Sequence, residues 1–248
     1  PNHQMKVHPE RIIAYGDLAL FNPALQENRD YICQVAADIV TRYDIDGFHI
    51  DDYFYPYPDG NRKFLDDASF KADPRGFANK EDWRRDNVNL FIEQLYNTVK
   101  QIKPYVKFGI SPFGIYRNKS DKYPEGSETT GFENYSGLYA DVMLWIEKGW
   151  MDYCIPQTYW NTGYKAADYA ILAKWWSDHA GDCLMYLGQD VERTITGVDP
   201  NHPESNQQRH KLNLERILNG LQGNCFWPAK SVVDNPRDYR TVLKTEYY

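Results

Sequence analysis

Strand-like and helix-like segments alternate along most of this 248-residue chain, and this alternation restricts the possible folds more than any other feature. Short apolar runs predict strands at residues 46–52, 106–111, 151–157, 183–189 and 224–229. Apolar residues at helical spacing predict helices at residues 27–44, 80–103, 136–149, 166–180 and 203–221. Strands that alternate with helices are typical of a parallel sheet built from right-handed crossovers. The sequence therefore predicts an α/β fold.

The same pattern predicts one catalytic barrel domain over residues 1–248. Residues 1–27 form a loop region with a hairpin that turns at Gly16 and Asp17, and residues 28–248 form a helix followed by five βα units. Two long loops, at residues 53–80 and 112–134, follow strands, as the active-site loops of a (β/α)8 TIM-type barrel do. Only five strands of such a barrel can be counted here, so three strands are unaccounted for. An open doubly wound sheet is the alternative, but no glycine-rich phosphate loop follows a strand.

Composition limits the classes of ligand. The formal net charge of -7 argues against a nucleic-acid-binding surface, which needs a basic face. No apolar stretch approaches the ~20 residues that span a bilayer. The four cysteines stand singly, without the spacing of a metal site, so we expect neither a metal nor a cofactor. The 20 tyrosines and 7 tryptophans favour a polar ligand with apolar faces, such as a sugar.

The strongest candidate site lies in "DGFHIDDYFYPYP", residues 46–58. Alternation along the strand places Phe48 and Ile50 toward the helices, and His49 and Asp51 toward the barrel interior. Asp51 then stands at the carboxyl end of its strand, where barrels carry catalytic groups. We expect Asp51 to be the key carboxylate, and Asp52 to point away from it, to cap the loop, or to serve as its catalytic partner.

Further polar and aromatic residues lie at or near the predicted strand ends, and we expect them to bind substrate together. A cleft of carboxylates, amides and aromatic rings suits a carbohydrate better than a small charged metabolite. Four of the rings, Tyr53, Tyr55, Trp160 and Trp227, are predicted to converge on one cleft. The full candidate set is His49, Tyr53, Tyr55, Arg117, Asn118, Gln157, Tyr159, Trp160, Gln189, Trp227 and Lys230.

Four segments, in order along nearly the whole chain, resemble the bacterial glycosyl-hydrolase-like family 10: "YDIDGFHIDDYFYPYP", "VKFGISPFGIYRN", "WMDYCIPQTYW" and "AKSVVDNPRDYR". The resemblance implies a (β/α)8 barrel in which the strand before Asp51 is the fourth. Only about the last five βα units would then lie in this chain, with three strands upstream of Pro1. It implies a glycosidase, often exported or lipid-anchored, that acts on envelope or extracellular polysaccharide, with peptidoglycan-type N-acetylated glycans among the substrates. A periplasmic or cell-surface location would follow.

The first segment also resembles, more distantly, the DGxDxDxE strand of family 18 chitinases, but Tyr53 stands where that family has its acidic glutamate. The proton donor is therefore open among Asp52, Glu133, Glu128, Asp190 and a residue upstream of Pro1. Two other functions remain: a non-catalytic carbohydrate-binding barrel, and a metal-dependent hydrolase that uses His49, Asp51 and Asp52. The second is disfavoured because such barrels recruit several histidines from strand ends.

Overall fold

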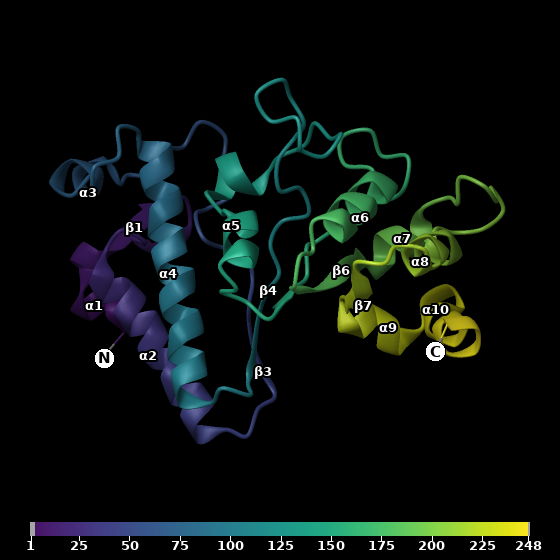
Figure 1. The fold of residues 1–248 in the computed structure, drawn as a ribbon, viewed down its shortest axis with the longest axis horizontal. Coiled ribbons are helices and arrows are strands. Elements are labelled where there is room, and N and C mark those ends of the chain that lie inside the picture. The colour runs from purple at the N-terminus through teal and green to yellow at the C-terminus, as the bar shows by residue number, and fades with distance from the viewer. Residues whose placement is uncertain (1–2, 248) are drawn as a thin grey trace. The chain divides into compact units, whose positions relative to one another are not determined.

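The structure, a computed structural model, describes residues 3–247. Five strands form one parallel sheet in the order β3-β4-β5-β6-β7 (Figure 1). They are β3 (Gly47–Ile50), β4 (Lys107–Ile110), β5 (Tyr153–Cys154), β6 (Leu184–Asp190) and β7 (Leu221–Trp227). All five overlap the predicted runs, and consecutive strands are neighbours, as repeated βα crossovers require. The predicted α/β class is confirmed.

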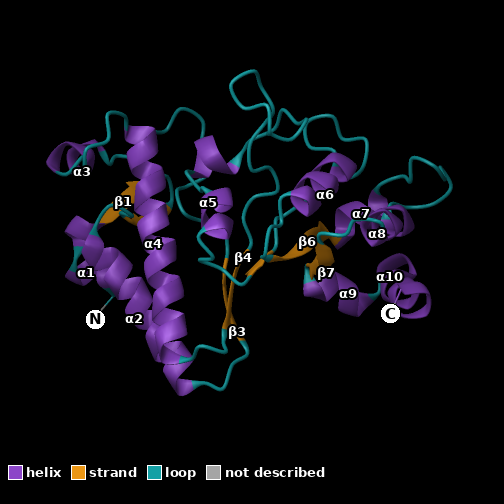
Figure 2. Cartoon of the chain, in the orientation of Figure 1, coloured by secondary structure: helices purple, strands orange, loops and turns teal. Residues whose placement is uncertain are grey.

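The chain divides into two compact units, and β4 contributes to both. The first unit holds the residues up to Phe108 and Tyr135–Trp150, and the second holds Gly109–Asn134 and the residues from Met151 onward. Figure 2 distinguishes the helices, strands and loops of each unit. The helices of the first unit are α1 (Gln4–Val7), the short 3-10 helix η1 (Pro9–Arg11), α2 (Gln26–Arg42), α3 (Asp67–Ala72), α4 (Lys80–Ile102) and α5 (Val142–Glu147).

The predicted hairpin is present in the first unit as β1 (Ile12–Tyr15) paired antiparallel with β2 (Leu18–Phe21). Gly16 in the turn has φ +61°, a left-handed conformation that glycine adopts without a steric penalty. The hairpin leads into α2 (Figure 1). The predicted helix at 27–44 is therefore confirmed within two residues at each end.

Helices α2 and α4 lie side by side and cover one face of β3 (Figure 1). Val40 from α2 and Val99 from α4 share a fully buried cluster with Val106, and Phe48 of β3 packs against it. His49, the next residue, is exposed on the opposite face. The predicted alternation of β3 is confirmed, since the side chain of Phe48 faces the helices and that of His49 does not.

In the second unit, β6 and β7 pair over most of their length, and helices pack beside them. These helices are α6 (Tyr169–Asp178), α7 (Val191–Thr196), α8 (Gln208–Arg216), α9 (Ala229–Asp234), η3 (Pro236–Asp238), α10 (Tyr239–Val242) and the π-helix η4 (Leu243–Tyr247). Val191 and Ile195 of α7 pack with Leu212 of α8 and Tyr239 of α10, and Phe226 of β7 joins this cluster.

Two predicted helices differ from the structure. The segment predicted as a helix at 136–149 is interrupted: a π-helical turn, η2 (Asn134–Leu138), is followed by Tyr139 with φ +56°, and α5 begins only after Asp141. The side chain of Asp141 caps α5 by accepting a hydrogen bond from the Leu144 N–H at 3.4 Å, which fixes a new start. The helix predicted at 203–221 is shortened to α8. Among residues 3–247, no helix is long and apolar enough to cross a membrane.

Candidate functional site

Two consecutive carboxyl groups follow β3 in the first unit, and their environments differ. Asp51 is exposed, and its Oδ1 accepts a hydrogen bond from the backbone N–H of Asp52 at 2.9 Å. Asp52 is only 2% exposed, and its Oδ2 accepts a hydrogen bond from the Tyr57 hydroxyl. A chain that alternates sides at each residue separates two neighbouring side chains in this way.

Burial raises the pKa of Asp52 to about 6, although the hydrogen bond from Tyr57 acts in the opposite direction. The charge of Asp51 raises the pKa of Asp52 further. Asp52 therefore retains its proton to a much higher pH than an ordinary aspartate. A carboxyl group that keeps its proton up to about pH 6, beside an exposed carboxylate, has the properties of a general acid.

His49 lies below this pair on β3. Desolvation by the surrounding protein lowers the pKa of its imidazole, and the negative charge of Asp51 opposes that shift. This electrostatic interaction places His49 near Asp51, as the alternation of the strand predicts. At near-neutral pH a His49 ring with a lowered pKa is neutral, so it can donate or accept a hydrogen bond next to Asp51.

The aromatic residues after Asp52 fall into two groups. Tyr53 is 74% exposed, and its ring meets that of Tyr57 edge-on with the centroids 6.1 Å apart. Tyr55 is only 2% exposed, and its hydroxyl accepts a hydrogen bond from Asn87 Nδ2 at 3.0 Å. The predicted stacking of Tyr55 on a sugar is therefore wrong, because its ring is packed inside the first unit.

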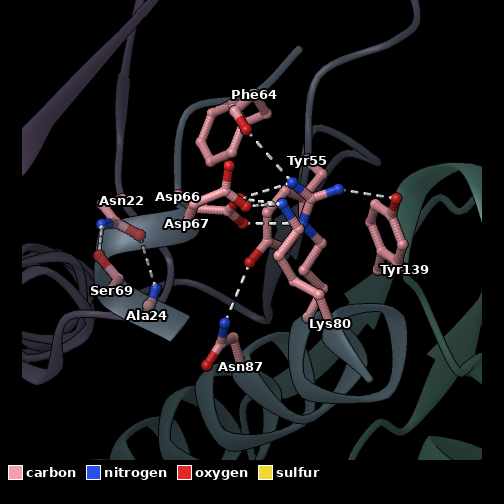
Figure 3. A network of polar contacts seen from close by, with 11 residues as sticks. Asn22, Ala24, Tyr55, Phe64, Asp66, Asp67, Ser69, Lys80, Asn87 and Tyr139 are labelled. Carbon is pink, nitrogen blue, oxygen red and sulfur yellow. Dashed lines mark hydrogen bonds and ion pairs between the residues drawn. The ribbon is translucent and has the colours of Figure 1, made fainter. Parts of the chain in front are cut away.

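Tyr55 belongs to a buried polar network that holds the long loop after β3 (Figure 3). The Arg84 guanidinium of α4 donates to both carboxylate oxygens of the fully buried Asp66, at 2.7 and 2.6 Å. It also donates to the Tyr139 hydroxyl at 2.8 Å and lies over the Tyr55 ring at 5.3 Å. Lys80 adds an ion pair to Asp66 at 3.3 Å. No sequence pattern indicates this network, because its members are far apart along the chain.

A cavity of about 590 Å³ opens in the first unit beside the loop that carries Tyr53 and Tyr57. Its wall is mainly apolar and comes from the β1–β2 hairpin, α2, the loop after β3 and α4. Residues that line it include Leu18, Leu20, Phe21, Ile32, Val88 and Phe91. This volume is within the usual range for small-ligand sites. Tyr57 lines the cavity and also donates a hydrogen bond to Asp52, so it connects the cavity to the carboxyl pair.

In the second unit, one aromatic pair joins a half-buried ring to an exposed one. The rings of Tyr159 and Trp227 are stacked, with centroids 5.8 Å apart and an interplanar angle of 19°. Trp227 is 55% exposed at the end of β7, before a cis peptide bond to Pro228. Trp160 instead packs edge-on against Phe113 and is half-buried. The Tyr159–Trp227 pair thus presents an aromatic surface to solvent, as the prediction for Trp227 requires.

Other candidate residues of the second unit have structural partners. Gln189 is 1% exposed, and its Nε2 donates to Glu215 of α8 at 2.7 Å and to Asn224 at 2.6 Å. Its amide nitrogen is satisfied inside the protein, so we leave Gln189 out of the proposed site. Gln157 is half-buried, and its Nε2 donates to the Ser111 carbonyl at 3.0 Å. Lys230 is exposed and forms an ion pair with Asp234 one turn along α9.

The loop after β4 is braced by its own side chains. Asn118 donates from its backbone N–H and its side chain to Glu133 Oε2, at 2.7 and 2.9 Å. The Arg117 guanidinium lies over the Tyr123 ring. Glu128 is exposed and pairs with Lys119 at 2.9 Å. These contacts shape the loop, and the predicted substrate contacts of Arg117 and Asn118 stay predictions.

The remaining acid candidate, Asp190, caps the N-terminus of α7. Its Oδ1 accepts a hydrogen bond from the Arg193 N–H at 3.0 Å, and its Oδ2 lies 3.3 Å from the Arg193 side chain. Both contacts hold the Asp190 carboxyl group at the first turn of α7. Asp52 is the described candidate whose carboxyl group is buried and has a raised pKa, as a proton donor needs. No group of three or more metal-ligating side chains is present in the described part of the chain.

Glycoside hydrolysis uses two carboxyl groups, and such a pair follows β3 of the parallel sheet. A comparison of folds finds a similar architecture in a solved domain. The chain superposes on the glycoside hydrolase domain of PgaB (BpsB) from Bordetella bronchiseptica with a TM-score of 0.58. That match covers 92% of this chain and 64% of the other, at 11% identity, so it concerns the fold alone.

The family follows from sequence. The model of the family Glycosyl hydrolase-like 10 matches residues 1–203, and the chain belongs to this family. It is 39% identical over 251 residues to glycosyl hydrolase YngK of Bacillus subtilis, covering 100% of this chain and 49% of that protein. It is 42% identical over 171 residues to glycosyl hydrolase DigH of Escherichia coli K12, covering 69% of this chain and 38% of that protein. The chain thus spans about half the length, or less, of these relatives. The family predicted from the four sequence segments is confirmed.

Proposed function

We propose that this chain forms part of a glycoside hydrolase, with Asp51 as its ionised carboxylate and Asp52 as its proton donor. The observation that carries the proposal is the contrast within this pair: Asp51 is exposed, whereas Asp52 is buried with a pKa raised to about 6. Glycoside hydrolysis uses two carboxyl groups in different protonation states, one as acid and one as nucleophile, base or electrostatic stabiliser.

In the proposed reaction, Asp52 gives its proton to the glycosidic oxygen as the bond from that oxygen to the anomeric carbon breaks. Positive charge then develops at the sugar, and the Asp51 carboxylate stabilises this charge more strongly than it stabilises the neutral substrate. A water molecule supplies the new hydroxyl group, and the proton that it releases restores Asp52. His49, beside Asp51, serves as a hydrogen-bonding neighbour.

We propose a polysaccharide substrate from the bacterial envelope or extracellular matrix, including peptidoglycan-type N-acetylated glycans, and an exported, periplasmic or cell-surface location. Family membership supports this choice of substrate class. Exposed Tyr53 and the stacked Tyr159–Trp227 pair offer aromatic faces for sugar rings. The apolar cavity beside Tyr57 has room for a sugar unit or its acyl substituent.

We further propose that the five strands are the last five of a (β/α)8 barrel. The consecutive strand order and the superposition on a glycoside hydrolase domain support this arrangement. In such a barrel the residues after β3 lie at the face that carries the active site.

The test compares turnover by Asp51→Asn and Asp52→Asn proteins on glycan strands and on activated aryl glycosides. Asp51→Asn removes the charge but keeps the shape, so turnover should fall by on the order of a thousandfold, while sugar binding persists. Asp52→Asn should lose activity on glycan strands but retain much of it on aryl glycosides, because a good leaving group needs no proton. Asp44→Asn makes the same charge change before β3 and should leave turnover unchanged.

Undiminished turnover by Asp51→Asn would falsify the assignment of the carboxylate. Binding of glycans without any turnover by the unmodified protein would instead support the carbohydrate-binding alternative. Tryptophan fluorescence during titration with N-acetylated oligosaccharides reports that binding, since stacking on Trp227 changes its emission.

A further inference from the structure

Asp52 is held at three points. Its backbone N–H donates to Asp51 Oδ1 at 2.9 Å, and its carbonyl accepts from the Phe54 N–H at 2.9 Å, which fixes the main chain in a tight turn. The third contact is the hydrogen bond from the Tyr57 hydroxyl to Oδ2. The first two contacts hold the backbone, whereas the third acts directly on the carboxyl group.

Tyr57 is itself fixed by the loop on both sides. Two residues earlier, Tyr55 is anchored by Asn87 and packs edge-on against Phe64, with centroids 5.2 Å apart. Two residues later, the Asp59 N–H donates to the Tyr15 hydroxyl of the hairpin at 3.0 Å. The phenol is therefore presented to Asp52 by a loop whose position does not depend on Asp52.

The electrostatics fix the direction of this hydrogen bond. Burial, followed by the hydrogen bond to Asp52, raises the pKa of Tyr57 far above its usual value, so the phenol remains protonated and donates. The titratable groups acting on the Asp52 carboxyl are Tyr57 and Asp51, and the pKa of neighbouring Tyr53 is in turn raised by burial and by both carboxylates. Tyr57 is the side chain that lowers the pKa of Asp52, against burial and against Asp51.

We propose that Tyr57 is a positioning residue for the acid: its hydroxyl orients the Asp52 carboxyl and stabilises the carboxylate that remains when Asp52 gives up its proton. This inference rests on the proposed role of Asp52 as proton donor. Before the proton passes to the leaving oxygen, Tyr57 donates its hydrogen bond to a neutral carboxyl group. Afterwards Tyr57 donates to a carboxylate anion, and this hydrogen bond is stronger. Tyr57 thereby assists proton donation without touching the substrate bond.

The decisive variant is Tyr57→Phe, which keeps the ring that lines the cavity and removes only the donor. Loss of a hydrogen bond to a charged group should raise the pKa of Asp52 by about one to two units. NMR of protein carrying 13C-carboxyl aspartate measures this pKa directly, with the Asp52 resonance identified by its absence from Asp52→Asn. The alkaline limb of the kcat/KM profile should move upward by the same amount, and kcat should fall most for poor leaving groups.

Tyr53→Phe is the matched control for the NMR measurement, because it removes a neighbouring phenol that packs against Tyr57, and it should shift the Asp52 pKa by no more than a few tenths of a unit. Site-specific replacement of Tyr57 by 3,5-difluorotyrosine provides the opposite change: a more acidic donor should lower the pKa of Asp52. This second variant keeps the test available if Tyr57→Phe does not fold.

An Asp52 pKa that is the same in Tyr57→Phe and the unmodified protein overturns the inference, whatever the activity. So does a Tyr57→Phe effect that Tyr53→Phe reproduces in full. The expected pKa shifts in a protein that hydrolyses no glycan would instead leave the Tyr57–Asp52 interaction standing and refute the proposed function. The two failures are therefore distinguishable.

Discussion

At the scale of single residues, the candidate site depends on a difference between two identical side chains. Asp51 remains in water, while Asp52 turns beneath Tyr57 and loses nearly all of its solvent contact. A carboxyl group in that position has a raised pKa because water no longer solvates its charge. The separation of roles within the pair thus follows from burial, not from residue type.

Burial of Asp52 should also appear as a pH dependence of stability. Its pKa is raised from 3.8 to about 6 in the folded protein, so between these values the folded state binds more protons than the unfolded state. This contribution to the free energy of unfolding is therefore fully present below pH ~4 and is lost as the pH rises through about 6.

Asp52→Asn removes the titrating group and should stabilise the protein near pH 7.5 by on the order of 1–3 kcal/mol. The difference from the unmodified protein should disappear near pH 4. Urea unfolding followed by circular dichroism at both pH values measures it. A variant that is equally destabilised at pH 4 and pH 7.5 would show that Asp52 is not held in the protonated form by burial.

At the scale of elements, the loop after β3 is held by α4. The Arg84 side chain donates two hydrogen bonds to Asp66 and one to the Tyr139 hydroxyl (Figure 3). Its guanidinium also lies over the face of the Tyr55 ring. The same loop carries Tyr57 between its anchors at Tyr55 and Asp66. A long loop fixed at several buried points keeps its side chains in place, which an active site requires.

Arg84→Met should destabilise the first unit by about 3 kcal/mol or more, since it leaves the Asp66 carboxylate buried with only the Lys80 ion pair. Adding Asp66→Leu to Arg84→Met should restore most of the loss, because no unpaired charge then remains. Arg42→Ala, which breaks an exposed ion pair with Asp38, is the control and should cost less than about 1 kcal/mol. Urea unfolding measures all three, and a similar small cost for Arg84→Met and Arg42→Ala would contradict this account.

At the scale of the whole molecule, the strand order runs in sequence and β3 stands at one edge of the sheet. An exposed edge strand offers unpaired backbone groups to another strand. In the proposed barrel, that edge is occupied by the strand that precedes it. The family relatives are about twice as long as this chain, which leaves room in them for further βα units.

A version of the protein extended by roughly 90 residues before Pro1, enough for three βα units, should protect the β3 backbone amides. We expect slower hydrogen exchange at residues 47–50 in the extended protein than in the 248-residue chain, measured by mass spectrometry of peptic peptides. Exchange in α8, in the second unit, serves as the internal control and should not change. Equal exchange of β3 in both proteins would contradict the proposed barrel closure.

Local sequence patterns were sufficient to predict the class of fold and the position of the carboxyl pair. Hydrophobic periodicity is a local property, so it located all five strands and the long helices α2 and α4. It also placed Phe48 toward the helices and Asp51 just beyond the end of β3, because alternation in a strand needs no information from elsewhere. The four sequence segments identified the family for the same reason, because each is a short motif that can be recognised without knowledge of the tertiary structure.

Which of these side chains are available to a ligand depends instead on contacts between distant parts of the chain. Tyr55 and Gln189 have the residue types of a sugar site, but their hydrogen-bonding partners lie 32 and 26 positions away, at Asn87 and Glu215. The break after η2 depends on the left-handed backbone of Tyr139, whose hydroxyl accepts a hydrogen bond from Arg84. The difference in burial between Asp51 and Asp52 likewise depends on the long loop, which places Tyr57 over Asp52. Burial is set by segments that are distant along the chain, and no local sequence pattern describes them.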